Sequence, residues 1–417
     1  MHTNYKMPEK DSLISLYGDK YVERGERIEK AIKSFTETFG DGDFMVFSVP
    51  GRSEICGNHT DHNHGEVFAA SINLDIIAVA RKTDSGEVRL LSEGFSKEHV
   101  GIGDLTPKQG DEGKSSALIR GMLDGFVKNG HEICSFDCFM TSNVLGGSGL
   151  SSSAAFEVAV GTVLNHLAND GKIDYIEVSK IAQYAENVHF GKPCGLMDQI
   201  ACASGGFVNI DFADPKSPKC VRLPFDIDKH GYALCIISTG GSHADLTDDY
   251  ASVPAEMKKV ASFFKKDVLR GITINDIIKN TPALREFAGD RAILRAIHFI
   301  SENERVENMR SALEKDDIDT FLDIINESGR SSAEFLQNYY SAKAPTEQGI
   351  TLGYAISKAL LGGRGAVREH GGGFAGTVQA FVPKDMIDDF KEKIENVFGK
   401  GSLCALFVRK DGAVRII

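Results

Sequence analysis

Glycine and serine residues that could hold a phosphate group are concentrated in SNVLGGSGLSSSAAFE, residues 142–157. Glycine lets a ligand approach the backbone closely, and the helix N-terminus expected next offers free N–H groups and a positive dipole end to an anion. The glycines are Gly146, Gly147 and Gly149. The serines, which can cap a helix, bind phosphate or ligate magnesium, are Ser151, Ser152 and Ser153. The segment is predicted to bind a nucleoside triphosphate, with a plain turn and helix cap as the alternative.

Two carboxylates follow in AENVHFGKPCGLMDQIA, residues 185–201. Phosphoryl transfer needs a metal ion on the phosphates and a base or positioning group on the nucleophile. Glu186 and Asp198 could divide these tasks, with one carboxylate holding magnesium and the other meeting the acceptor hydroxyl. A surface charge is the alternative for either residue, but Asp198 lies among apolar residues.

Polar side chains are crowded into VPGRSEICGNHTDHNHGEV, residues 49–67, between two expected strands. Such a turn suits a polyhydroxylated ligand. A metal cluster is the alternative, formed by His59, Asp61, His62 and His64, although no further motif completes its shell. A second glycine cluster, HGGGFAGTVQAF at residues 370–381, is either a close approach to the phosphate loop or a hairpin turn. The stretch QGDEGKSS at residues 109–116 imitates a P-loop, but Lys108 stands in place of its first glycine, which favours a solvated loop and helix cap.

Composition narrows the class of protein. The chain has 417 residues, of which 42% are hydrophobic, enough for two or three domains. Its net charge of −12, without a basic tract, argues against binding to nucleic acid or an anionic membrane. We see no secretory signal at the N-terminus and no apolar run long enough to span a membrane. The 8 scattered cysteines are expected to be free thiols in a reducing cytoplasm, and we expect a monomer.

Hydrophobic periodicity predicts alternating helices and strands. Helices are expected over residues 21–39, 115–130, 151–168, 172–190, 348–362 and 386–399, with mainly helical structure over 254–340. Strands are expected over 44–49, 66–72, 75–82, 87–93, 135–144, 377–383 and 402–410, the first of them ending at Pro50. The change to short strands after residue 204 predicts a domain boundary near residue 205.

Taken in order, these motifs resemble those of the galactokinases, members of the GHMP small-molecule kinase superfamily. GLSSSAAFE resembles the phosphate loop, KPCGLMDQIA the segment with the catalytic aspartate, and GGGFAG the third motif. PGRSEICGNHTDHNHG resembles the sugar signature Gly-Arg-x-Asn-x-Ile-Gly-Glu-His-x-Asp-Tyr. The resemblance implies an α+β fold of two domains. Residues 1–205 would form a domain like domain 2 of ribosomal protein S5, and residues 206–417 a ferredoxin-like domain. It also implies transfer of the γ-phosphate of ATP to the anomeric hydroxyl of galactose, with Mg²⁺.

The resemblance also implies roles for individual residues. Asp198 matches the catalytic base, and Arg52 matches the arginine between that base and the transferring phosphate. Ser153 and Glu186 match the magnesium ligands. The phosphate contacts would be Gly146, Gly147, Gly149, Ser151, Ser152 and Ser153. The sugar contacts would be Arg52, Asn58, His59, Asp61, Gly195, Asp198 and Tyr250.

Several positions depart from the galactokinase pattern. Asn58 stands where the family has a glutamate that contacts the sugar, and Glu54 stands at the signature asparagine. The other departures are Cys56, His62, Glu369, His370 and Ala375. Because none of them touches the proposed catalytic or magnesium residues, the departures bear on the identity of the sugar and not on the expected kinase chemistry. A kinase for a related sugar such as N-acetylgalactosamine and a non-catalytic galactose and ATP sensor are the alternatives, and the intact Ser151–Ala155 argues against the sensor.

Overall fold

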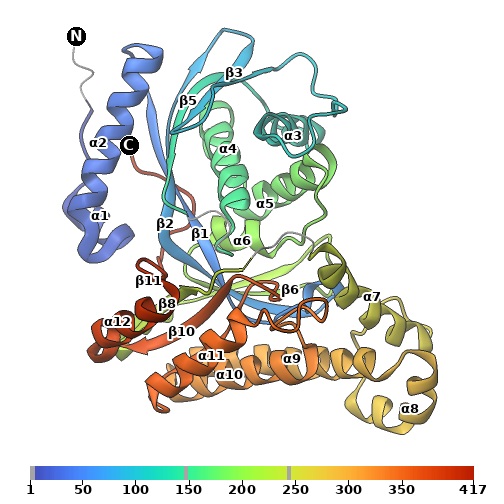
Figure 1. Ribbon diagram of the computed structural model, residues 1–417. Helices are drawn as coiled ribbons and strands as arrows, with labels where there is room; N and C mark the ends of the chain where they lie inside the picture. Colours follow the sequence, from blue (N-terminus) through green and yellow to red (C-terminus); the bar gives the residue numbers. More distant parts are fainter. Residues whose placement is uncertain (1–4, 145–148, 242–245) are drawn as a thin grey trace.

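Two β-sheets and the helices that cover them make up the chain (Figure 1). A computed structural model describes residues 5–144, 149–241 and 246–417. The predicted α+β class is confirmed. None of the helices in these ranges is both long enough and apolar enough to cross a membrane.

The first sheet is built around β2 (Glu66–Thr83), a strand of 18 residues. Its strand order is β12-β1-β2-β5-β3-β4, and β6 and β7 extend it beside the first half of β2. The bounds are β1 (Met45–Cys56), β3 (Glu87–Ser92), β4 (Glu98–Gly101), β5 (Ser135–Ser142), β6 (Phe207–Asp211), β7 (Lys219–Leu223) and β12 (Val414–Arg415). All pairs are antiparallel except β3 with β5.

Helices cover both faces of this sheet (Figure 1). On one face lie α1 (Lys10–Tyr17) and α2 (Tyr21–Phe39), and the predicted apolar stripe of Ile28, Ile32 and Phe35 is buried there. On the other face lie α3 (Ser115–Lys128), α4 (Ser152–Asn169), α5 (Tyr175–Tyr184) and α6 (Met197–Ser204). A π-helical turn over residues 185–190 follows α5. Cover on both faces explains why β2 is almost continuously buried rather than alternating.

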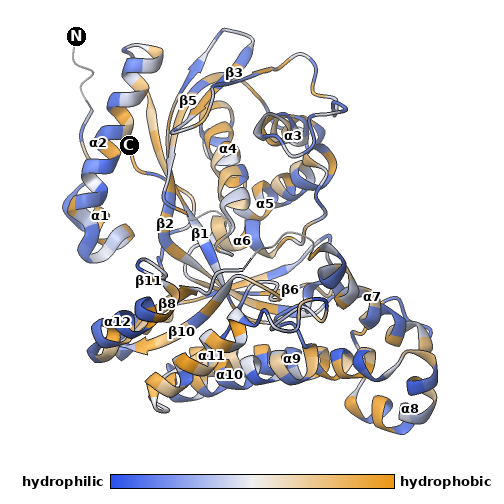
Figure 2. Ribbon diagram, viewed as in Figure 1, coloured by the Kyte–Doolittle hydropathy of each residue, from blue (hydrophilic) through white to orange (hydrophobic). Residues whose placement is uncertain are grey.

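The second sheet has the order β11-β8-β10-β9. Its strands are β8 (Tyr232–Ser238), β9 (Ala366–His370), β10 (Thr377–Pro383) and β11 (Leu403–Leu406). The apolar residues of α11 (Gly349–Leu361) and α12 (Ile387–Phe398) form one core cluster with this sheet. The remaining helices are α7 (Thr247–Phe263), α8 (Ile274–Phe287), α9 (Asp290–Glu314) and α10 (Ile318–Ser331). Figure 2 shows that outer helices such as α8 and α12 carry both hydrophilic and hydrophobic residues, as expected for helices with one buried face.

The two sheets share a core, and strands from the second half of the sequence belong to the first sheet. Phe321 of α10 packs against Phe207 of β6 in the first sheet, at a ring distance of 6.1 Å, and against Phe381 of β10 in the second, at 5.0 Å. Strands β6, β7 and β12 all follow residue 205, yet they lie in the first sheet. The domain boundary near residue 205 stays a prediction, and strands from both sides of that residue pair in the first sheet.

Some predicted element boundaries were wrong. Strand β1 does not end at Pro50 but continues to Cys56, and the two strands predicted over 66–72 and 75–82 are the single strand β2. Strands β4, β9 and β12 were not predicted. The extension of β1 matters most, because it carries Arg52 and Glu54 on a strand rather than in a turn.

Candidate active site

Arg52 is positioned by an irregularity in β1. The pairing of β1 with β2 shifts register between Pro50 and Arg52, and again between Glu54 and Cys56. Proline cannot donate to the ladder, and a bulge re-aims the side chains beside it. The Arg52 residue is only 6% exposed. Its Nε and Nη2 donate to the two carboxylate oxygens of Asp198, each at 2.8 Å, which is a bidentate pair.

Asp198 lies in the first turn of α6, where it also accepts a hydrogen bond from the hydroxyl of Ser151. Burial alone would raise the pKa of Asp198. The charge and hydrogen bonds of Arg52, together with the Ser151 bond, outweigh that effect, so the pKa lies below its ordinary value. Asp198 is therefore ionised at neutral pH. It can accept a hydrogen bond from a substrate hydroxyl, although it is a weak base.

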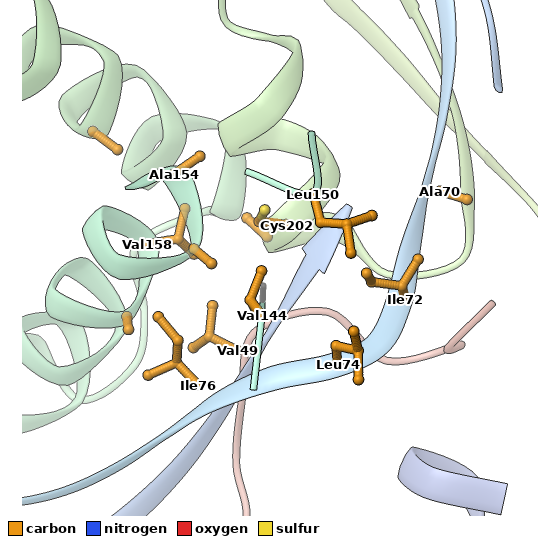
Figure 3. Close-up of a cluster of buried hydrophobic side chains, with 14 of the residues drawn as sticks. Val49, Ala70, Ile72, Leu74, Ile76, Val144, Leu150, Ala154, Val158 and Cys202 are labelled. Carbon is orange, nitrogen blue, oxygen red and sulfur yellow. The ribbon is translucent and has the colours of Figure 1, made fainter. Parts of the chain in front are cut away.

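Gly149 and Leu150, at the end of the predicted phosphate loop, lie against Arg52. The carbonyl of Gly149 accepts from Arg52 Nη1, and the backbone N–H of Arg52 donates to the Leu150 carbonyl at 3.2 Å. Leu150 and Val144, on the two sides of the loop, point into one apolar cluster (Figure 3). Ser151 has φ 57°, and its side chain does not cap α4. The N-terminus of α4 thus stays open for an anion. Gly146 and Gly147 lie outside the described residues.

Ser153 and Glu186 place two oxygen atoms that could ligate magnesium close to each other. Ser153 Oγ lies 3.5 Å from Glu186 Oε1, and Glu186 is 2% exposed. Gln199 donates to the other Glu186 oxygen at 3.0 Å, and Lys192 Nζ lies 3.2 Å from Oε1. No group of three His, Cys, Asp or Glu side chains within the described ranges is arranged to hold a metal. A hydroxyl and a carboxylate fit magnesium, which commonly takes one or two protein ligands and completes its shell with phosphate and water.

A polar cavity of about 140 Å³ opens beside Arg52. Its lining comes from both halves of the sequence. Predicted sugar contacts in the lining are Arg52, Asn58, His59 and Asp61, and other lining residues include Glu54, Gly371 and Gly372. The third glycine motif thus forms a wall of this cavity, and Gly149 of the phosphate loop lies beside the neighbouring His370.

His59 presents a neutral ring to the cavity. Its Nε2 lies 3.0 Å from the carbonyl oxygen of Gly372. Because a carbonyl can only accept, Nε2 carries the proton and Nδ1 is an acceptor. Burial lowers the pKa of His59, with help from the neighbouring His62, to about 4. His59 is therefore uncharged over the physiological range.

Asp61 and Gly195 are in direct contact. A Cβ atom added to Gly195 would overlap Oδ2 of Asp61. Position 195 thus requires glycine if Asp61 is to keep its orientation at the cavity. The structure brings these two predicted sugar contacts together from segments more than a hundred residues apart.

The amide of Asn58 is hydrogen-bonded within the protein. Its Nδ2 donates to Glu54 Oε1 at 2.9 Å and to the Gly371 carbonyl at 2.7 Å. Its Oδ1 accepts from Asn338 Nδ2 at 2.8 Å. Asn58 is 1% exposed.

Tyr250 stands behind the cavity wall rather than in it. Its hydroxyl donates to the Gly373 carbonyl at 3.0 Å, and its ring packs edge-on against Phe374 at 5.4 Å. A Cβ atom added to Gly372 would lie 2.6 Å from Tyr250 Cε1. Tyr250 therefore supports the glycine turn in this structure.

A second cavity, of about 410 Å³, adjoins the start of α4 and was not predicted. Its lining includes Ser152 and Phe156 of α4, Ile76 of β2, Phe95 and Ser115. These residues come from separate elements and form no local motif. The only sequence signal is the phosphate loop itself, which implies that room for the rest of a nucleotide must lie beside it.

Comparison with known proteins gives two family matches. Residues 117–206 match the GHMP kinases N terminal domain, and residues 33–82 match the galactokinase galactose-binding signature. The second match contains Arg52 and the polar turn, and the first contains the phosphate loop and Asp198.

Similar proteins cover nearly the whole chain. A galactokinase of Actinobacillus pleuropneumoniae is 30% identical over 376 residues, which is 89% of this chain and 93% of the relative. A galactokinase of Clostridium tetani is 29% identical over 377 residues, with the same two shares. The crystal structure of Lactococcus lactis galactokinase complexed with galactose superposes with a TM-score of 0.78 at 24% identity, over 93% of this chain and 100% of that one. Methanococcus jannaschii mevalonate kinase superposes with a TM-score of 0.61 at 14% identity, over 88% and 99%. The predicted GHMP kinase fold is thereby confirmed.

Proposed function

We propose that this chain, which belongs to the galactokinase family of the GHMP kinases, transfers the γ-phosphate of ATP to the anomeric hydroxyl of galactose and forms galactose 1-phosphate and ADP. One observation carries the proposal. The guanidinium of Arg52 lines the polar cavity, pairs with both oxygens of Asp198 and binds the carbonyl of Gly149 in the phosphate loop. One side chain thus connects a cavity for a polyhydroxylated ligand to a site for phosphate.

In the proposed reaction, Asp198 and Arg52 both act on the acceptor oxygen. The ionised carboxylate of Asp198 accepts a hydrogen bond from the acceptor hydroxyl and orients its oxygen toward the γ-phosphorus. A new O–P bond forms as the bond to the ADP oxygen breaks, and the hydroxyl proton leaves through Asp198. The charge of Arg52 stabilises the oxygen as it becomes an anion. Because the transition state is loose, a weak base in the right place suffices.

We further propose that the nucleotide extends from the loop into the second cavity, beside Ser152 and Phe156. The backbone N–H groups at the start of α4 would bind phosphate oxygens, together with Gly146, Gly147, Gly149 and the hydroxyls of Ser151, Ser152 and Ser153. Ser153 and Glu186 would hold Mg²⁺, which neutralises charge on the phosphates when bound. Their 3.5 Å separation supports a shared cation.

The sugar would bind in the cavity of about 140 Å³. Neutral His59 offers an acceptor at Nδ1, and Asp61 offers a carboxylate next to Gly195. Asn58 lies in the lining of this cavity, and Tyr250 would support the glycine turn behind it.

ADP release from purified protein with Mg–ATP tests the activity. We expect turnover with galactose, and weaker or no turnover with galactosamine, N-acetylgalactosamine, arabinose and glucose. Turnover of another sugar but not galactose would contradict the substrate assignment. Binding without ADP release from any sugar would indicate a sensor.

Asp198→Asn tests the mechanism. An amide keeps the shape of the side chain, but it loses the charge that pairs with Arg52 and receives the hydroxyl proton. We expect kcat to fall by about 10²–10⁴, with galactose binding retained in a calorimetric titration. A normal rate would overturn the role of Asp198.

We also propose that the protein works as a monomer in the cytoplasm. All eight cysteines are free in the structure, which is compatible with a reducing compartment. Light scattering of the purified protein tests the monomer, and cell fractionation tests the compartment.

A further inference from the structure

Two residues of the sugar signature have exchanged their chemical character in this chain. The signature has asparagine and then glutamate, four positions apart, whereas this chain has Glu54 and then Asn58. The exchanged side chains contact each other, because Asn58 Nδ2 donates to Glu54 Oε1 at 2.9 Å. The cavity therefore keeps one amide and one carboxylate at these two positions, but here the carboxylate is in β1 and the amide is in the turn that follows the strand.

The amide of Asn58 has little capacity left for a ligand. Its two donor hydrogens are used by Glu54 and the Gly371 carbonyl, and its oxygen already accepts from Asn338. An amide has two donors and one carbonyl oxygen, so only one lone pair of that oxygen is uncommitted. Asn58 is 1% exposed, which leaves almost none of it for contact.

Glu54, unlike Asn58, has hydrogen-bonding capacity left for a ligand. Its Oε1 accepts from Asn58 and, at 2.8 Å, from Arg368 Nη2, but no donor among the described residues reaches Oε2. The side chain keeps 7% exposure, whereas that of Arg368 has none, and Glu54 lines the cavity. A carboxylate offers about four acceptor positions. Glu54, which is ion-paired with Arg368 through Oε1, thus presents an unused acceptor oxygen to the cavity.

We propose that Glu54 is the residue that binds a sugar hydroxyl in this chain, and that Asn58 positions Glu54 rather than contacting the sugar. The proposal rests on the proposed function. Arg368 supports this arrangement from behind, since it also bonds to Glu369 at 3.0 Å and to the Ile55 carbonyl at 2.6 Å. The Glu54 carboxylate is thereby fixed through Oε1, and its Oε2 stays available to a ligand.

Glu54→Gln tests the proposal, and Glu369→Gln is its matched control. Both changes remove a carboxylate that pairs with Arg368, but Glu369 does not line the cavity. We expect Glu54→Gln to raise the KM for galactose about tenfold or more, because a charge-assisted hydrogen bond is lost, with the KM for ATP within about twofold of wild type. Glu369→Gln should leave both KM values near wild type.

Two further readouts separate binding from a structural effect. Among 2-, 3-, 4- and 6-deoxygalactose, the wild type should discriminate against the sugar that lacks the hydroxyl bound by Glu54, and Glu54→Gln should lose that discrimination. The double variant Glu54→Asn with Asn58→Glu restores the order of the signature and should return the galactose KM toward wild type.

An unchanged galactose KM in Glu54→Gln, or an equal rise in Glu369→Gln, would overturn the proposal. Failure of the proposed function is distinguishable, because it shows in the wild type alone as no ADP release. The Glu54 comparison would then be read from calorimetric galactose binding, where a Kd unchanged by Glu54→Gln would contradict it.

Discussion

Arg52 makes three kinds of contact from one side chain. It binds Asp198 through two nitrogens, the Gly149 carbonyl through the third, and it also lines the cavity proposed for the sugar. Only a planar guanidinium offers donors in this fork. The hydrogen-bond geometry of the site thus depends on a guanidinium and not only on a positive charge.

Arg52→Lys should therefore be far from conservative. A lysine ammonium cannot bind both oxygens of Asp198 and the loop carbonyl at once, so we expect kcat to fall by about 10²–10³. Arg89→Lys is the control, since Arg89 pairs with Asp137 away from the site and is 35% exposed. Steady-state rates at saturating ATP and galactose measure the effect. Equal rates for Arg52→Lys and wild type would contradict the role.

His59 predicts a pH dependence of stability. Its pKa is about 4 in the folded protein against an ordinary value of 6.5, so the unfolded chain binds the proton more readily. Its contribution is complete above pH 6.5 and is lost as the pH falls from 6.5 toward 4. We expect wild type to lose about 1 kcal/mol more unfolding free energy than His59→Gln between pH 7.5 and 5.5. Urea unfolding at both pH values measures this, and parallel losses would contradict it.

Helices and strands with a regular spacing of apolar residues were predicted correctly from the sequence. The apolar stripe of α2 and strand β10 at residues 377–383 were found because their periodicity matches their packing. Strand β9 was missed because its last three residues are Arg368, Glu369 and His370, which do not look like a buried strand. Those charges are tolerated because Arg368 pairs with Glu54, which is 314 positions away. No local signal contains such a partner.

The same contrast applies to the site. Short motifs contain the predicted phosphate loop, Arg52 and Asp198, which is why the sequence could indicate them. In the structure, Asp198 contacts both Arg52 and Ser151 of that loop. The second cavity and the role of the third motif as a wall of the first were not predicted. Both depend on which elements the fold places side by side.

The turn before α6 contains Gly195, which lies against Asp61. Gly195→Ala would push a methyl group into Oδ2 of Asp61, and the short carboxylate side chain must rotate away. We expect a higher KM for galactose, about tenfold, with little change in the KM for ATP or in stability. Gly103→Ala is the control, because its Cβ would meet nothing within 4 Å. A galactose KM equal to that of the control would show that Asp61 does not need its present orientation.

At the scale of the whole molecule, the two sheets are expected to unfold together. The ring of Phe321 is fully buried between β6 of the first sheet and β10 of the second. Phe321→Ala should lower the unfolding free energy by about 3–5 kcal/mol, in one transition seen by circular dichroism and by activity. Val22→Ala, at a position 56% exposed, should change it by less than about 0.5 kcal/mol. Two separate transitions would contradict a shared core.

The last strand lies in the first sheet. Strand β12 pairs with β1, and Arg409 donates to Ser48 in β1. On the ribosome, synthesis at roughly 5–20 residues per second means that β1 waits roughly 20–70 s for this partner. Over that interval the edge of β1 is unpaired, and the half of the protein made first cannot complete its fold. A nascent chain that ends before residue 414 would thus lack part of its first sheet, even though every motif of its proposed phosphate site has already been synthesised.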